Sequence, residues 1–214
     1  MGHLDSIWAY INRTLLYLPG IIIGLTVHEY FHALVAHWCG DNTSKEQGRV
    51  SLNPLKHIDP YGFIMLLVAG FGWAKPVQFN EQNLKNPKTD IIKIALAGPL
   101  SNALIAIILS VILVLAKPIF NDVNRTILNM FYYAIFINWG LFVFNLIPLP
   151  PLDGSHLLFQ PFRKYPAVYN AIYKYGSFIL FGLIILSIVS RSNFIPIGRL
   201  IELLGNGFLK LIGF

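Results

Sequence analysis

Apolar residues gather into five stretches along the chain, and polar residues fill the segments between them. The stretches cover residues 15–38, 61–73, 91–116, 127–147 and 176–190. A helix needs roughly 20 apolar residues to cross about 30 Å of hydrocarbon. The first, third and fourth stretches meet that length, and the fifth does so if it begins near Val168. The pattern therefore predicts an all-α polytopic membrane protein with about four to six transmembrane helices.

The second stretch, 61–73, is short and rich in glycine for a membrane span. Basic residues flank it on both sides, in 41–57 and in 74–93. Because Lys and Arg favour the cytoplasmic side of a membrane, both flanks are expected there, and the chain should enter the membrane and return. We predict a re-entrant loop or a small membrane-associated β-hairpin, since irregular backbone survives at depth only inside protein or beside a wet cavity.

The same charge rule places the N-terminus outside and residues 154–175 inside. The tail after residue 190 has mixed polarity, and its apolar positions predict an interfacial amphipathic helix that is broken at Gly205. A sixth span is the alternative for this segment. We expect one integral-membrane domain over 1–214, with a core of about 15–160 and C-terminal helices over about 165–214.

Composition supports a membrane location and argues against other classes of protein. Of the 214 residues, 55% are hydrophobic and only 12% are charged, and the net charge is +6. Average soluble domains have about twice this charged fraction. The basic residues lie between apolar runs, so we expect contact with the lipid bilayer and no binding of nucleic acid. Cys39 is the only cysteine, which excludes an internal disulfide and a multi-cysteine metal site.

The first apolar stretch contains ionisable residues: His28, Glu29 and His32 lie within "TVHEYFHALVAH", residues 26–37. Histidines four residues apart project from one face of a helix. They can bind one zinc ion, while the glutamate beside them acts on a water molecule that zinc makes more acidic. Ionisable side chains near the centre of a bilayer are rare and usually functional. The alternative is a buried polar cluster that holds helices together.

Catalytic zinc sites commonly have three protein ligands, so two histidines leave one missing. Asp153 is the best candidate because it follows "NLIPLPPLDG", whose prolines end the fourth helix and whose Gly154 permits a tight turn. The flanking residues stay apolar, so this broken segment should remain at depth and direct Asp153 towards the zinc. Asp59 is a weaker candidate. Capping of a fifth helix is the alternative role for Asp153.

Three segments in this order, "HEYFH" (28–32), "AGPLSN" (97–102) and "NLIPLPPLDG" (145–154), resemble the site-2 protease family of intramembrane zinc metalloproteases. Two others, "NPLKHIDPYG" (53–62) and "GWAKPV" (72–77), resemble its compact prokaryotic branch. Members of that branch lack PDZ and CBS domains, and we expect neither module here.

The resemblance covers roughly residues 20–160 and implies a catalytic zinc ion held by His28, His32 and Asp153, with Glu29 as the base. It also implies that the first, third and fourth spans form a helical core. Further, it implies a multi-pass protein of the prokaryotic plasma membrane that cleaves transmembrane protein or peptide substrates within the bilayer. Water would reach the site from the cytoplasmic side.

Four further polar residues are candidates for secondary roles. Asn102 and Asn145 match the family's asparagines, which the resemblance makes candidates for substrate positioning. Hydrogen bonding between helices is the alternative for both. His57 and His156 lie near the expected inner face, where each could come close to the site, and interfacial or capping roles are the alternative.

The leading hypothesis is hydrolysis of a peptide bond in a locally unwound transmembrane segment. An edge strand within 61–80 could hold that segment by β-augmentation. The resemblance implies either release of membrane-tethered regulators or clearance of signal-peptide remnants. The rival hypotheses are a metal-ion transporter, with His and Glu as transit ligands, and an inactive scaffold that binds transmembrane partners.

Overall fold

The computed structural model describes all residues except 1, 70–71, 121–124 and 191–196. Within the described residues the chain is helical, and its β-type pairing is limited to one isolated bridge. Four helices there are long and apolar enough to cross a membrane: Trp8–Trp38, Pro87–Ala116, Arg125–Asn145 and Pro166–Leu186. The predicted all-α polytopic fold class is confirmed, and the four spans correspond to the four long apolar stretches.

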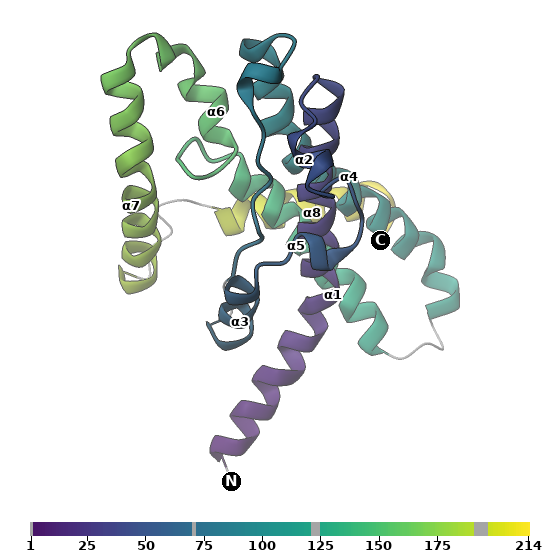
Figure 1. The fold of residues 1–214 in the computed structure, drawn as a ribbon. Coiled ribbons are helices and arrows are strands. Elements are labelled where there is room, and N and C mark those ends of the chain that lie inside the picture. The colour runs from purple at the N-terminus through teal and green to yellow at the C-terminus, as the bar shows by residue number, and fades with distance from the viewer. Residues whose placement is uncertain (1, 70–71, 121–124, 191–196) are drawn as a thin grey trace.

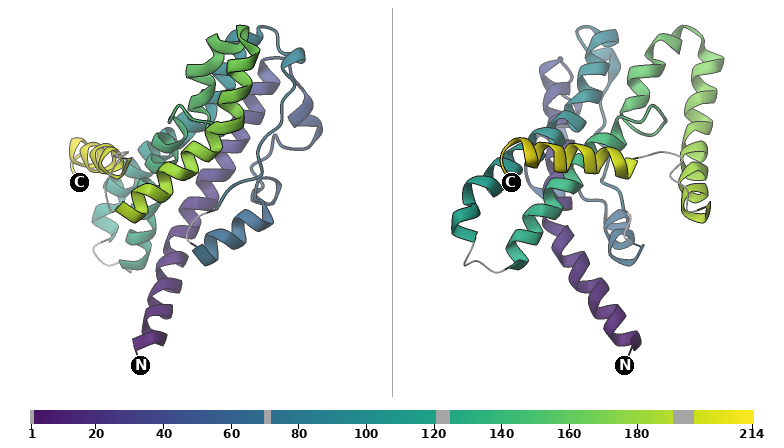
Figure 2. Two further views of the ribbon diagram at one scale, coloured as in Figure 1. Left: turned by 90° about the vertical axis from the view of Figure 1, so that its left-hand side faces the viewer. Right: turned by 180° about the vertical axis from the view of Figure 1, so that it is seen from behind.

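Three helices form the core: α1 (Gly2–Trp38), α4 (Pro87–Phe120) and α5 (Arg125–Asn145) pack against one another (Figures 1 and 2). Glycine allows α1 to approach α5 closely, because a Cβ atom at Gly20 would lie 2.7 Å from the Ala134 backbone. This confirms the predicted core of first, third and fourth spans. Helix α1 is longer than predicted, and its N-terminal turns extend beyond the bundle (Figure 2).

The second apolar stretch forms helix α3 (Pro60–Ala69), and the chain from residue 72 onwards runs back in extended form. A bridge joins Ile58 to Ala74, and Lys75 N donates to His57 O over 2.7 Å. A Cβ atom at Gly62 would lie 2.1 Å from Trp73 O, so only glycine fits at this contact. The stretch thus ends beside the residues where it began, as a re-entrant segment requires. Because most of the stretch, residues 61–69, is helical, the described part is not a β-hairpin.

Short helices interrupt the two polar loops, and Asp41 joins these loops. Helix α2 (Thr43–Glu46) lies in the first loop with a 3-10 helix at Pro54–Lys56, and a second 3-10 helix covers Glu81–Asn83. Asp41 is fully buried, and its carboxylate accepts hydrogen bonds from Thr43 Oγ1 (2.7 Å), Asn80 N (2.9 Å) and Asn83 Nδ2 (2.8 Å). The end of α1 is thereby tied to the end of the extended segment.

After α5 the chain forms helix α6 (Gly154–Phe159), a 3-10 helix (Gln160–Lys164) and helix α7 (Pro166–Ser190). Figure 1 shows α7 standing beside the bundle, at a distance from α1. Its contacts with other helices are mainly with the 3-10 helix that precedes it. The fifth apolar stretch is therefore a span that is joined to the core chiefly at one end.

Helix α8 (Ile197–Leu211) lies across α4 and α5 (Figure 2). The predicted break at Gly205 is wrong, because the helix continues through this residue. Gly205 is buried, and a Cβ atom there would lie 2.7 Å from the Phe136 ring. The glycine therefore permits close packing on α5. Ile195, which was included in the predicted helix, lies outside the described residues.

Candidate metal centre

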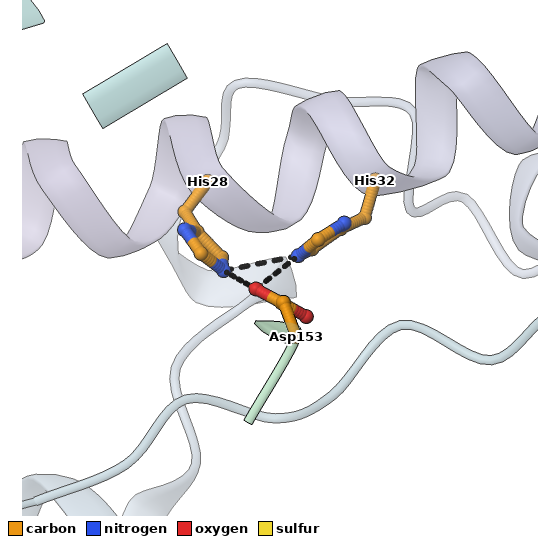
Figure 3. Close-up of side chains that lie close together, drawn as sticks. All are labelled: His28, His32 and Asp153. Atoms are coloured by element: carbon orange, nitrogen blue, oxygen red, sulfur yellow. Dashed lines mark hydrogen bonds and ion pairs between the residues drawn. The ribbon is translucent and has the colours of Figure 1, made fainter. Parts of the chain in front are cut away.

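The structure brings together three predicted ligands from distant parts of the sequence. Nε2 of His28 lies 3.2 Å from Asp153 Oδ2, Nε2 of His32 lies 3.3 Å from the same oxygen, and the two nitrogens are 3.0 Å apart (Figure 3). Both histidines are buried, and Asp153 is largely so. A tetrahedral zinc ion with bonds of 2.0–2.1 Å would hold its ligand atoms about 3.3 Å apart. The observed spacing fits this geometry.

The hydrogen bonds on the far side of each ring show where the protons are. Nδ1 of His28 contacts Asn102 Oδ1 and Nδ1 of His32 contacts Ile94 O, both at 2.7 Å. Since both partners are acceptors, each Nδ1–H donates, and each ring turns its Nε2 towards Asp153. Asp153 Oδ2 is buried and receives no hydrogen bond from the described residues. Two imidazole nitrogens and one carboxylate oxygen thus converge, an arrangement that a cation would satisfy.

Gly98 in α4 provides the space for such a cation. A Cβ atom at this position would lie 2.3 Å from His32 Nε2 and 2.6 Å from His28 Nε2. A methyl group would therefore occupy the space between the ligand atoms. Glycine in the segment "AGPLSN" leaves that space open, a role that the sequence alone did not reveal.

The proline-rich segment after α5 leads Asp153 to the two histidines, as the sequence predicted. Helix α5 ends at Asn145, and the segment that contains Pro148, Pro150 and Pro151 leads into α6. Asp153 precedes α6, but its side chain makes no capping hydrogen bond there, so the capping alternative does not describe this residue. The weaker ligand candidate, Asp59, accepts a hydrogen bond from Gly62 N (2.8 Å) at the start of α3 and is not part of the cluster.

Glu29 lies on α1 between the two histidines and contacts the extended segment. Its Oε2 accepts a hydrogen bond from Val77 N (2.9 Å) and lies 3.8 Å from Nη2 of Arg49. Arg49 is 4% exposed and also donates to Lys75 O, so it holds the extended segment and the carboxylate together. From the sequence, Arg49 was expected only as one of the basic residues of 41–57 on the cytoplasmic side. Nothing in the local sequence signals that it is buried beside Glu29.

His57 lies in the loop after Arg49 and is not one of the three converging ligands. It is fully buried, and its Nε2 pairs with Ser51 O (2.7 Å). Burial lowers the pKa of the His57 imidazole, so the ring is neutral at pH 7. His57 therefore supports the loop that carries Arg49.

The two asparagines have different environments. Asn102 is fully buried and donates to Gly24 O and Asn138 Oδ1, both at 3.0 Å, while its own oxygen faces His28. This is the interhelical bonding that the sequence left open, and it orients one ring of the cluster. Asn145 donates to Leu141 O in its own helix (3.0 Å) and lines the cavity beside the cluster. Substrate positioning by Asn145 stays a prediction.

A cavity of about 1000 Å³ opens in front of the cluster. Its ionisable lining residues are His28, Glu29, His32, Asp153 and His156. The rest of its wall is mostly apolar and comes from α1, α3, α4, α5, α7 and the extended segment. Five ionisable side chains therefore face a mostly apolar cavity.

Comparison with known proteins places the chain in a family. The model of peptidase family M50 matches residues 16–123 and 119–186. YwhC of Bacillus subtilis is 44% identical over 142 residues, which make up 64% of this chain and 65% of YwhC. Rip2 of Mycolicibacterium smegmatis is 28% identical over 151 residues, 68% of this chain and 57% of Rip2. Rip2 of Mycobacterium tuberculosis H37Rv is 26% identical over 191 residues, 86% of this chain and 71% of that protein.

All three relatives carry the words zinc metalloprotease in their names. The matched region covers less than two thirds of the length of the first two. No solved structure matches the chain significantly. The family model extends over α1, α4, α5, α6 and most of α7, the elements that carry the converging ligands and the cavity. The chain therefore belongs to peptidase family M50.

Proposed function

We propose that this chain is an intramembrane zinc metalloprotease that hydrolyses peptide bonds within transmembrane segments of proteins or peptides. The observation that supports this most directly is the convergence of His28 Nε2, His32 Nε2 and Asp153 Oδ2 beside Glu29. The lone-pair geometry, the spacing and the gap at Gly98 fit one zinc ion. Membership of family M50 and the names of the relatives agree with it.

In this proposal the residues have separate roles. His28, His32 and Asp153 would hold a zinc ion, which when bound would supply a Lewis acid for the scissile carbonyl and make a water molecule more acidic. Glu29 takes a proton from the attacking water and passes it to the leaving amine. Val77 N and Arg49 fix one oxygen of this carboxylate, which leaves the other oxygen for the proton. Asn102 keeps His28 in its ligating orientation.

The substrate class follows from the cavity and from the helices around it. The cavity wall is mostly apolar, and four helices of this chain are long enough to span a bilayer. A helical substrate must unwind locally, because intrahelical hydrogen bonding shields its amides. Within the described part of 72–80 the extended backbone passes Glu29, so it would pair with an unwound segment by β-augmentation. We place the site on the cytoplasmic side of the plasma membrane, and we propose release of regulators or clearance of signal-peptide remnants as its use.

The test compares the wild type, Glu29→Gln and the control Glu46→Gln in proteoliposomes with a tagged transmembrane peptide. Glu46 is an exposed acid in α2, away from the cavity. We expect equal zinc content in all three proteins and a loss of about 10²–10⁴-fold in cleavage for Glu29→Gln alone, since a positioned acid–base contributes that much. Wild-type turnover by Glu29→Gln would contradict the proposal. Zinc flux through the proteoliposomes, without cleavage, would support the rival transporter instead.

A further inference from the structure

His156 faces the same cavity as the predicted zinc ligands but has no role in the mechanism above. It lies three residues after Asp153, and its backbone N donates to Asp153 O (3.0 Å) in the first turn of α6. Side chains three apart on a helix share a face. His156 is half-buried and lines the cavity together with Asp153, His28 and His32. An imidazole therefore lies within reach of a peptide bound at the cluster.

Contacts from α7 hold this imidazole in one orientation. Nδ1 of His156 lies 3.1 Å from Tyr173 Oη. The Tyr169 ring stacks on Tyr173 with centroids 4.6 Å apart. The Arg163 guanidinium lies 5.6 Å from the Tyr169 ring centroid and pairs with Glu81. The position of the imidazole is thus set by a series of contacts that reaches the end of the extended segment.

The contact with Tyr173 also determines which ring nitrogen carries the proton. A phenol is a stronger hydrogen-bond donor than a neutral imidazole N–H, and an imidazole nitrogen is a stronger acceptor than a phenol oxygen. Tyr173 therefore donates to Nδ1, which requires the proton of the neutral ring to lie on Nε2.

We propose that His156 is a catalytic residue whose Nε2–H donates a hydrogen bond to the oxygen of the scissile carbonyl as that carbon becomes tetrahedral. The inference rests on the proposed peptidase function and adds a group to the same site. His156 keeps its proton throughout, and the proton for the leaving amine still comes from Glu29. A donor that is fixed in advance and directed at a developing oxyanion contributes about 10²–10³-fold in kcat.

A purely structural role is the alternative, in which His156 only joins α6 to α7. The first experiment separates the two roles with His156→Leu, His156→Gln and the control His37→Gln. His37 is bonded to Asn42 and Lys45 at the end of α1, away from the cavity. Glutamine keeps an N–H donor near the position of Nε2, whereas leucine fills similar space without a donor.

We expect His156→Leu to lower kcat about 10²-fold, in line with the loss of one oxyanion donor, with KM and zinc content close to those of the wild type. His156→Gln should recover at least tenfold of that loss, and His37→Gln should behave as wild type. Equal activity of the leucine variant and the wild type, or equal losses for leucine and glutamine, would overturn the proposal. If the wild type itself does not cleave, the proposed function fails, an outcome distinct from the failure of His156 alone.

The second experiment measures the tautomer without relying on activity. The zinc-loaded protein is labelled with ¹⁵N-histidine, and the signals of His156 are assigned by their absence from the spectrum of His156→Gln. We expect a protonated Nε2 and an unprotonated Nδ1 in the wild type, and a mixture of tautomers in Tyr173→Phe, where the donor to Nδ1 is lost. A protonated Nδ1 in the wild type would overturn the assignment.

Discussion

The two walls of the cavity differ in how firmly they are held. On one wall, α1, α4 and α5 interlock through glycine contacts, and each histidine of the cluster is fixed by a hydrogen bond at Nδ1. On the other wall, α7 contacts other helices mainly at the 3-10 helix that precedes it and meets Pro150 closely at Gly176, and its Phe178 and Phe181 side chains are 74% and 59% exposed. The two histidines of the cluster therefore lie on the packed wall, and α7, which supplies the other wall of the cavity, stands apart from α1 (Figure 1).

This difference follows from what each wall must do in the proposed reaction. Ligand atoms must keep their positions to within about 0.5 Å for a metal centre to work. A wall that admits substrates needs no such precision, and regions with few buried contacts open at low cost in free energy. Substitutions in the packed wall should therefore alter metal retention, and substitutions of apolar cavity residues in the loose wall should alter KM without loss of metal.

The largest effect is expected for Gly98→Ala in the packed wall. The new methyl group would lie 2.3 Å from His32 Nε2, in the space that the metal needs, so we expect loss of bound zinc and of cleavage. The matched control is Gly182→Ala in α7, where a Cβ atom would meet nothing within 4 Å. Metal analysis and peptide cleavage measure both. Stoichiometric zinc in Gly98→Ala would show that the metal lies elsewhere.

A smaller effect is expected for Asn102→Ala. Its oxygen fixes the Nδ1–H tautomer of His28, and loss of such a supporting partner typically weakens metal binding about 10–100-fold. Asn145→Ala is the control, because within the described residues this side chain donates to its own helix and does not contact either histidine. Competition with a zinc chelator measures the affinity. Similar zinc affinities for the two variants would remove the distinction between the asparagines.

Much of the metal centre was predictable from the sequence because its geometry is local or forced by proline. Four-residue spacing places His28 and His32 on one face of any helix, and the prolines before Asp153 end α5 and turn the chain back. The buried partners of these residues were not predictable. Arg49 reaches Glu29, and Tyr173 reaches His156, through tertiary contacts that no spacing encodes.

Glycine was ambiguous for the same reason. A glycine can break a helix or admit a neighbour, and only the packing distinguishes the two. Gly205 was expected to break the last helix, but it lies against Phe136 within a continuous α8. Gly98 was noted only as part of a motif, and the space that it opens becomes visible once α4 is packed on α1.

A third prediction concerns Asp41, whose carboxylate joins the two polar loops. Burial alone would raise the pKa of Asp41, but hydrogen bonds from Thr43, Asn83 and Asn80 hold it below its usual range. A carboxyl with a lowered pKa stabilises the fold fully above its ordinary pKa of about 4 and loses this contribution as the pH falls through the lower value. We therefore expect the hydrogen bonds of the Asp41 carboxylate to join the loops at neutral pH and to weaken only in strong acid.

Asp41→Asn should remove about 1–3 kcal/mol of this stabilisation at neutral pH, because hydrogen-bond donors remain buried without their charged acceptor. Limited proteolysis of the loops and thermal unfolding between pH 3 and pH 7 measure the loss. The variant should show a flatter dependence on pH than the wild type. Parallel pH curves for the two proteins would contradict the role of this carboxylate.

The smallest effects are expected in α7. Leu180 is 7% exposed and lines the cavity, so Leu180→Ala should change KM by a few-fold while zinc content stays the same. Phe178 is 74% exposed and does not line the cavity, and Phe178→Ala should leave both quantities unchanged. Loss of zinc from either variant would show that the two walls are coupled.

Helix α8 packs on the bundle and supports the packed wall. It lies across α4 and α5, with Gly205 against Phe136 and with Leu209 in the cluster that contains Ala106 and Ile135. A helix that crosses two others stabilises their contact. Separating α4 from α5 would also remove their contacts with α8 and expose apolar surface. Among the described residues, no helix crosses α7 in this way. An incoming substrate helix would therefore displace the C-terminal part of α7 first, beyond the contacts that Tyr173 and Gly176 make near its start, and the metal centre would keep its dimensions.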